Sequence, residues 1–289
     1  MEQTVEQAVG PRASGLPQDG LGALTALVGR GGVVVLSGAG LSTESGIPDY
    51  RGPTGAARPS TPMTYQVFRG DAAARRRYWA RSHLGWPLMA RAQPNAGHRA
   101  VAQLQARGLL RGIVTQNVDG LHAAGGAHDV VELHGGLDRV VCLDCGDRSS
   151  RAELDRRLRA ANHSWQAHVL AVHPDGDVDL ADDELESFRT VDCTLCGGVL
   201  KPDVVFFGET VPRDRVQHCF ALVEGARSLL VLGSSLTVMS GYRFVLRASK
   251  LGLPVAIVNQ GATRGDGHAT LTVDAPLGAL LPELARCTA

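Results

Sequence analysis

The 289-residue sequence has little that would hold it in a membrane or on a nucleic acid. Its apolar runs fall well short of the roughly 20 residues that cross a bilayer, and its mean hydropathy of -0.02 is typical of a soluble globular chain. Lysine plus arginine equals aspartate plus glutamate at 29 each, so no net positive field attracts a nucleic acid. We therefore expect neither partner.

Lysine is scarce, and a targeting signal is missing. Lys201 and Lys250 are the only lysines, and the preference for arginine is typical of a GC-rich bacterial genome. The first stretch of the chain has neither the apolar core of a secretory signal nor the pattern of a transit peptide. We expect residues 1–20 to form a flexible tail on a cytoplasmic protein. The basic run at 75–77 is interpreted as a solvated helix face.

Short, β-branched runs alternate with helix-like segments along most of the chain. This pattern is typical of a parallel sheet that helices cover on both faces. The predicted strands are 33–37, 112–116, 130–133, 228–233, 254–259 and 270–274, and the predicted helices between them include 95–107, 214–225 and 241–251. The sequence therefore predicts a doubly wound α/β fold, which binds its ligands at the carboxyl ends of the strands.

Two stretches do not fit this alternation. Residues 52–94 begin as a loop and continue into a helix-compatible segment, and residues 142–196 contain both cysteine pairs. We predict that these stretches form a smaller domain that faces the sheet. The larger domain is assigned residues 21–55, 99–141 and 197–289, and the smaller one a helical insertion at 56–98 and a zinc-binding module at 142–196.

The cysteines indicate a metal site. They form two C-x-x-C pairs, which are Cys142 with Cys145 and Cys193 with Cys196. Each pair can hold one side of a tetrahedral metal ion, and four thiolates around zinc leave no open position for a reactive water. A redox dithiol would need only one pair, and the cytoplasm disfavours disulfides. A structural zinc ion is therefore the favoured interpretation.

The predicted strand at 33–37 continues into the loop GAGLSTESGIPDYR. A β-branched run that ends in glycines is how a buried strand presents backbone N–H groups to an anion. The third glycine of a dinucleotide fingerprint is missing, however, and Gly46 and Pro48 would end a helix within a few residues. The loop thus begins as a phosphate-binding turn but does not continue as the usual long helix.

Further motifs follow this loop in order. They are TQNVDGLH at 115–122, VELHG at 131–135, KPDVVFFGE at 201–209 and GSS at 233–235. With the glycine loop and the four cysteines, this set resembles the sirtuin family of NAD-dependent protein deacylases from about Leu21 to Pro282. The resemblance implies a Rossmann-type doubly wound parallel sheet, a smaller zinc-ribbon plus helical module, and a cleft between them for NAD and acyl-lysine.

The resemblance also implies which residues bind NAD, the consumed co-substrate. The diphosphate would meet Gly38, Ala39, Gly40 and Ser42, and the nicotinamide ribose would be covered by a mobile loop that includes Ser45, Asp49, Tyr50 and Arg51. Tyr50 stands where the family usually has Phe. Residues at other strand ends would hold the riboses, phosphates and adenine: Gln116, Gly233, Ser234, Ser235, Asn259, Gln260, Gly261 and Leu277.

Three residues would carry the reaction that the resemblance implies. His134 would be the general base at a ribose hydroxyl, and an imidazole suits this task because its pKa lies near neutrality. Asn117 would lie near the ribose and the attacking water, and Asp119 at the nicotinamide carboxamide. The products would be nicotinamide, deacylated lysine and 2'-O-acyl-ADP-ribose.

The implied partner is an acylated-lysine protein or peptide, clamped between two segments by strand addition. The segments are Val205, Phe206, Phe207, Gly208 and Glu209, and Val238, Met239 and Ser240. Because backbone pairing reads few side chains, we expect little selection by the clamp among protein substrates. We expect the protein to be a monomer.

Parts of the sequence resemble the class II branch of the family, represented by the fourth human sirtuin. That branch is associated with weak deacetylation and with longer or branched acyl groups. Tyr78 and Arg81 would share one helix face, where a phenol and a guanidinium can grip an acyl carboxylate, although an exposed helix arginine is the alternative. Residues 162–188 are expected to approach the acyl channel.

Other functions remain as alternatives. Protein mono-ADP-ribosyl transfer and lipoamidase activity would use the same scaffold. A non-catalytic NAD sensor is disfavoured because His134, Asn117 and Asp119 occur together. An oxidoreductase is disfavoured because the helix after the glycine loop is interrupted.

Overall fold

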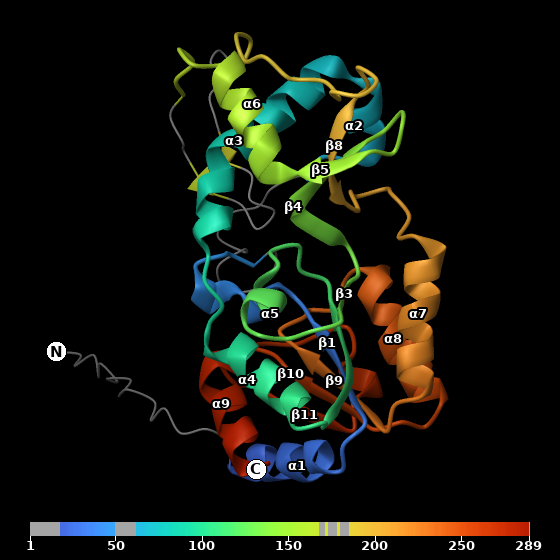
Figure 1. The fold of residues 1–289 in the computed structure, drawn as a ribbon. Helices are drawn as coiled ribbons and strands as arrows, with labels where there is room; N and C mark the ends of the chain where they lie inside the picture. Colours follow the sequence, from blue (N-terminus) through green and yellow to red (C-terminus); the bar gives the residue numbers. More distant parts are fainter. Residues whose placement is uncertain (1–17, 50–61, 168–170, 173–177, 180–184, 289) are drawn as a thin grey trace, which may run out of the picture.

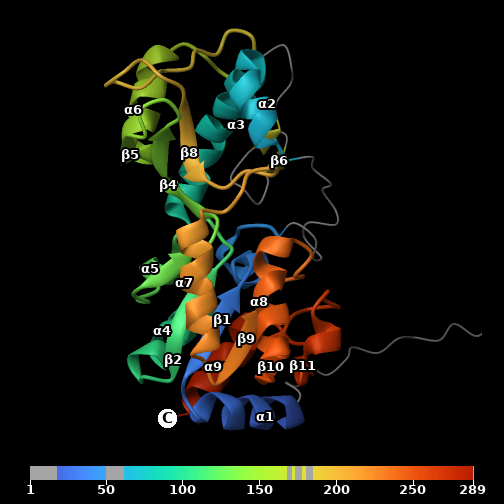
Figure 2. The same ribbon diagram turned by 90° about the vertical axis from the view of Figure 1, so that its right-hand side faces the viewer.

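The computed structural model describes residues 18–49, 62–167, 171–172, 178–179 and 185–288. These residues form a larger part on a six-stranded sheet and a smaller part on a three-stranded sheet (Figures 1 and 2). The first helix begins at Gln18, within the stretch 1–20 predicted as a tail, and the rest of that stretch lies outside the described residues. Within the described ranges, no helix has both the length and the apolar character needed to span a bilayer.

The larger sheet is parallel and has the order β11-β10-β9-β1-β2-β3. Its strands are β1 (Val33–Ser37), β2 (Leu110–Thr115), β3 (Val130–Glu132), β9 (Ser228–Leu232), β10 (Val255–Val258) and β11 (Leu271–Val273). Each predicted strand is confirmed within two residues at either end. The chain winds to opposite sides of β1, so the crevice of a doubly wound fold opens at the ends of β1, β2 and β9.

Helices cover both faces of this sheet (Figure 1). One face carries α1 (Gln18–Gly29), α4 (Ala96–Ala106) and α9 (Leu277–Cys287), and the other carries α7 (Arg213–Glu224) and α8 (Met239–Lys250). Successive residues of β1 alternate between the two cores: Val33 and Val35 pack against the first set of helices, and Val34 and Leu36 against the second. Burial on both faces explains why β1 reads as a continuous apolar run.

The smaller part contains the antiparallel sheet β5-β4-β8, formed by β4 (Gly135–Cys142), β5 (Arg148–Ser150) and β8 (Leu200–Val204). Around it lie α2 (Tyr65–Gly70), α3 (Ala72–Arg91), α6 (Arg151–Ala161) and the hairpin of β6 (Ala171–Val172) with β7 (Val178–Asp179). Residues 135–141 and 197–204 were predicted in the larger domain. They belong instead to this sheet, because β4 and β8 pair with each other and not with the parallel strands.

Two buried histidines lie beneath the strand ends, at the start of α4 and in the short helix α5 (Leu121–Ala124). The rings of His98 and His122 are 5.2 Å apart between centroids, and both residues are almost fully buried. His122 contacts the hydroxyl of Ser37 through Nε2 at 2.8 Å, and Ser37 donates to Thr115 at 2.8 Å. The histidines are therefore part of the polar layer that supports the ends of β1 and β2.

These histidines should make the fold sensitive to acid. Burial lowers the pKa of both His98 and His122 from 6.5 to about 4. The unfolded chain therefore takes up protons between these values while the folded chain stays neutral at both sites. The contribution of these histidines to the free energy of unfolding is present above pH 6.5 and is lost as pH falls toward 4. The loss is on the order of 3 kcal/mol for each histidine.

Urea unfolding at pH 7 and pH 5 should show this loss, and His122→Phe should reduce it. His128→Phe is the control, because the His128 side chain is 70% exposed and solvent reaches it in both states. An unfolding free energy that falls equally in the wild type and in His122→Phe would contradict the assignment.

Candidate active site

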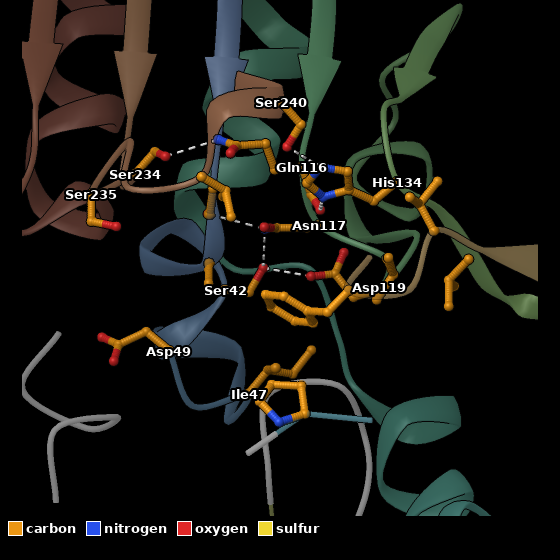
Figure 3. Close-up of a pocket in the computed structure, with 18 of the residues that line it drawn as sticks. Ser42, Ile47, Asp49, Gln116, Asn117, Asp119, His134, Ser234, Ser235 and Ser240 are labelled. Atoms are coloured by element: carbon orange, nitrogen blue, oxygen red, sulfur yellow. Dashed lines mark hydrogen bonds between the residues drawn. The ribbon is translucent and has the colours of Figure 1, made fainter. Parts of the chain in front are cut away.

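A cavity of about 870 Å³ lies where the carboxyl ends of the parallel strands face the smaller part (Figure 3). Most of the described residues predicted for the site line it. From the larger sheet these are Gly38, Ala39, Gly40, Ser42, Asp49, Gln116, Asn117, Asp119, His134, Gly233, Ser234, Ser235, Asn259, Gln260 and Leu277. The predicted substrate residues that also line the cavity are Tyr78, Arg81, Val205, Phe206, Phe207, Gly208, Glu209, Val238 and Ser240.

Some predicted residues are not part of the lining. Ser45 ends a short 3₁₀ turn, and its hydroxyl is buried without a hydrogen-bond partner. The N–H of Gly261 faces the carboxylate of Asp274, and Met239 lies 47% exposed at the start of α8. The predicted residues Tyr50 and Arg51 lie outside the described ranges, as does most of the segment between 168 and 184.

Several lining residues were not among those named from the sequence, and Glu44, Ile47 and Arg77 are three of them. Glu44 accepts from the N–H of Gly278 at 2.9 Å and so ties the glycine loop to the first turn of α9. Ile47 is buried in the stretch after this loop. Arg77 belongs to the basic run interpreted as a solvated helix face, but it lines the cavity. Its place in the sequence next to Tyr78 and close to Arg81 could have indicated that Arg77 belongs to the same site.

The glycine loop closes the gap between β1 and β9. The N–H of Gly40 donates to the carbonyl of Gly233 at 2.8 Å, and a Cβ at Gly40 would lie 2.9 Å from the Cα of Gly233. A Cβ at Gly38 would lie 2.7 Å from the Cβ of Ser234. These approaches require glycine. After the loop the chain forms only short 3₁₀ turns, and Gly46 ends the second of them with φ 84°, which confirms the predicted interruption.

Asn117, Ser42 and Asp119 form a connected polar group on the cavity wall (Figure 3). The amide of Asn117 donates to the carbonyl of Gly38 and to the hydroxyl of Ser42, each at 3.0 Å. Ser42 donates in turn to Asp119 at 2.7 Å, and the other carboxylate oxygen of Asp119 accepts from the N–H of Leu121. This chain fixes each side chain in one orientation, as expected for groups that position a ligand.

His134 lies across the cavity with a defined tautomer (Figure 3). Its Nδ1 lies 2.8 Å from the main-chain carbonyl oxygen of Gln116, which can only accept, so Nδ1 carries the proton. Nε2 therefore carries a lone pair and is an acceptor, and it lies 2.8 Å from Oγ of Ser240. Burial lowers the pKa of His134, because the charged ring would lose its hydration. The ring is thus a neutral base at neutral pH.

Gln116 connects the two ends of the cavity. Its side-chain amide donates to Oγ of Ser234 at 2.8 Å, whereas its main-chain carbonyl accepts from His134. On the far side, the amide of Asn259 donates to the carbonyls of Gln260 and Gly261 and so closes the turn after β10. The conformations of the loops after these strands are therefore fixed by side chains that also line the cavity.

The segment after β8 lies between the two parts. Val205 donates its N–H to the carbonyl of His134 at 2.8 Å, and Phe207 accepts from the N–H of Tyr65 at 2.9 Å. Buried Lys201 approaches Glu209 at 3.2 Å, and Glu209 also accepts from the N–H of Phe206. This ion pair bends the chain at 205–209 into the cavity and leaves Phe207 39% exposed at its mouth.

The far end of the cavity is lined from α3. Tyr78 and Arg81 share a helix face as predicted, and Tyr78 is buried in an aromatic cluster with Phe68, Trp79 and Phe206. Nε of Arg81 is buried and, among the described residues, makes no hydrogen bond. A guanidinium with a spare donor on the wall of a cavity can recognise an acceptor group on a ligand.

The four cysteines come together at the tip of the smaller part. The sulfurs of Cys142, Cys145, Cys193 and Cys196 all lie within 4.8 Å of one another. The sulfurs of Cys142 and Cys196 are 3.5 Å apart, and those of Cys145 and Cys193 are 3.8 Å apart. Zinc–sulfur bonds near 2.3 Å in a tetrahedron require sulfurs about 3.8 Å apart, so the cluster fits a structural zinc ion.

The geometry defines a nucleotide-binding α/β protein with a four-cysteine metal module and a neutral histidine base in the cleft. Comparison with known proteins gives the family. Residues 38–240 match the model of the Sir2 family. Over 255 residues the chain is 63% identical to "NAD-dependent protein deacetylase 1" of Streptomyces coelicolor, covering 88% of this chain and 85% of the relative. Identity to the protein of that name from Mycobacterium avium is 52%, covering 91% and 93%.

Solved structures agree with this result. A structure described as "Sir2 bound to acetylated peptide" superposes with a TM-score of 0.73 at 26% identity, covering 92% of this chain and 97% of that one. Another, "Sir2-p53 peptide-NAD+", gives 0.70 at 29% identity, covering 91% and 95%. The chain belongs to the Sir2 family, the sirtuins.

The cysteine cluster predicts one zinc ion per chain. Cys196→Ser should lower the bound zinc, measured by mass spectrometry of the metal, well below one equivalent, because one of four ligands is lost. It should also lower the melting temperature. Cys287→Ser, which changes an exposed thiol outside the cluster, should keep the full zinc content. Full zinc content in Cys196→Ser would show that this sulfur is not a ligand.

Proposed function

We propose that this protein is an NAD-dependent protein-lysine deacylase. It cleaves NAD to nicotinamide and transfers the acyl group of a lysine to ADP-ribose, giving deacylated lysine and 2'-O-acyl-ADP-ribose. The observation that carries the proposal is the single cavity in which the glycine loop, the Asn117–Ser42–Asp119 group and the neutral His134 face one another. The Sir2 family match and relatives named as NAD-dependent protein deacetylases support it.

In this proposal NAD lies along the strand ends. The N–H groups of Gly38 and Gly40 donate to the carbonyls of Leu232 and Gly233, so in this loop the N–H of Ala39 would be the one offered to the diphosphate. Asn259 and Leu277 would border the adenosine, and Asp119 would meet the nicotinamide carboxamide at the other end. The fixed orientation of Asn117 and Asp119 would hold the nicotinamide ribose in line with the incoming acyl oxygen.

His134 would act after nicotinamide leaves. Its Nε2 is the acceptor atom of the ring and can take up the proton that a ribose hydroxyl loses, and the oxygen of that hydroxyl then attacks the carbon of the bound acyl group. The bond from Nδ1 to the carbonyl of Gln116 holds the ring in the basic tautomer and would stabilise the imidazolium that forms. The lowered pKa of His134 keeps this base unprotonated at neutral pH.

The substrate would enter from the side of Phe207 and Met239. Residues 205–209 and the extended Val238 line the cavity and could pair with an extended peptide by strand addition, whereas Met239 and Ser240 begin α8 and would flank it. Phe207 and Met239, both partly exposed, would border the residues next to the acyl-lysine. Affinity would then come mainly from backbone pairing.

The class II relationship and its acyl preference are a finer part of the proposal. The part of the cavity that α3 lines carries Tyr78, Arg81 and also Arg77. Two guanidinium groups and a phenol favour an acyl chain that ends in a carboxylate, such as a succinyl or glutaryl group. This supports acyl-lysine substrates beyond acetyl-lysine.

The central test is product analysis with NAD and acyl-lysine peptides. The wild type should release nicotinamide and form O-acyl-ADP-ribose in step with deacylation. His134→Ala should reduce acyl-ADP-ribose formation by about 100-fold or more, because general-base catalysis is lost. Nicotinamide release without deacylation would instead indicate ADP-ribosyl transfer to protein, and no NAD turnover on any peptide would overturn the proposed function.

The acyl preference can be tested on α3. Arg81→Met should reduce kcat/KM for succinyl- and glutaryl-lysine peptides about tenfold relative to acetyl-lysine, since a charged hydrogen bond is lost. Arg76→Met is the matched control, because Arg76 contacts the carbonyl of Glu186 and does not line the cavity. Equal loss for all acyl groups, or no loss, would remove the carboxylate role.

A further inference from the structure

Ser240 stands in front of the histidine base. Its Oγ lies 2.8 Å from Nε2 of His134, although the two residues are 106 positions apart in the chain. Both side chains line the cavity and point toward each other in Figure 3. Ser240 is the second residue of α8, so its hydroxyl reaches the base from the start of a helix.

The direction of this hydrogen bond follows from the tautomer. Because Nδ1 of His134 donates to a carbonyl oxygen, Nε2 is an acceptor in the neutral ring. The hydroxyl of Ser240 must then be the donor, with its own oxygen lone pairs left for another group. The lone pair that would accept the ribose proton is therefore already occupied by the serine.

The position of Ser240 is built into the packing of α8. The next residue, Gly241, lies so close to Gln116 that a Cβ there would be 2.4 Å from Oε1. Gln116 is the residue whose main-chain carbonyl fixes His134. The first turn of α8 and the histidine thus rest on the same residue, which sets the distance between Ser240 and Nε2.

We infer that Ser240 is a catalytic residue that relays the ribose proton to His134, an inference that rests on the proposed function. The ribose hydroxyl gives its proton to Oγ of Ser240 while Ser240 gives its own proton to Nε2. The serine stays neutral and His134 becomes the imidazolium. The ribose oxygen forms its bond to the carbon of the imidate that arises when the acyl oxygen displaces nicotinamide, and the electron pair of the C=N π bond moves to the lysine nitrogen. The imidazolium later returns the proton to solvent.

The relay separates the two halves of the reaction. Cleavage of NAD, which can be followed by exchange of labelled nicotinamide into NAD, needs no base at the ribose hydroxyl. Formation of O-acyl-ADP-ribose, in contrast, requires a base at this hydroxyl. Ser240→Ala should therefore lower the rate of O-acyl-ADP-ribose formation about tenfold or more, within the range of proton-transfer effects, and leave nicotinamide exchange within about twofold.

Two variants make this test specific. Ser240→Thr keeps a hydroxyl at the same place and should restore most of the activity. Ser249→Ala removes another serine of α8, one that lies 3.2 Å from Nδ1 of His268 and does not line the cavity, and it should behave as the wild type.

A second measurement uses mixtures of H₂O and D₂O. The rate of O-acyl-ADP-ribose formation by the wild type should depend on the deuterium fraction along a curve, because two protons move. The rate of Ser240→Ala should depend on it linearly.

The outcomes are distinct. An unchanged or faster Ser240→Ala variant would overturn the relay, because the serine would then only cover the base. Equal loss of exchange and acyl transfer in both Ser240 variants would also overturn it and would show a structural role. No deacylation by the wild type would overturn the proposed function, and the relay with it.

Discussion

The close approach of two loops at the ends of β1 and β9 is the constraint on which the site depends. The backbone of Gly40 lies against Gly233, and Gly38 lies against Ser234, at distances that leave no room for a Cβ. A side chain at any of these glycines would separate the loops. The bond from Gln116 to Ser234 would then lengthen, and the cavity wall would lose its shape.

Gln116 links the position of these two loops to the position of His134. Its side chain holds the loop after β9, its main-chain carbonyl holds His134, and its Oε1 lies over Gly241. The loop proposed to bind phosphate and the proposed base His134 are thus positioned by one residue just after β2. Behind it, His122, Ser37 and Thr115 form a buried polar chain that supports the same strand ends. Preorganised polar groups of this kind cost little reorganisation during a reaction.

The sequence predicted the larger sheet well because its signals are local. A buried parallel strand such as β1 is a short β-branched run between turn residues, and this pattern needs no knowledge of its neighbours. The smaller sheet was assigned incorrectly at 135–141 and 197–204 because its strands are recognised only by their pairing. β4 pairs with β8 across the whole cysteine-containing insertion, and nothing in either strand alone marks that partner.

By itself the sequence predicted the strands, the glycine loop and the two cysteine pairs, each from residue type and short spacing. The expected roles of His134, Asn117 and Asp119 came from the resemblance of the ordered motifs to the sirtuin family. Only the tertiary structure decided that Arg77 lines the cavity, that His98 packs against His122 and that Ser240 faces the base. These contacts join segments far apart in the chain, so they exist only once helices and sheet have packed together.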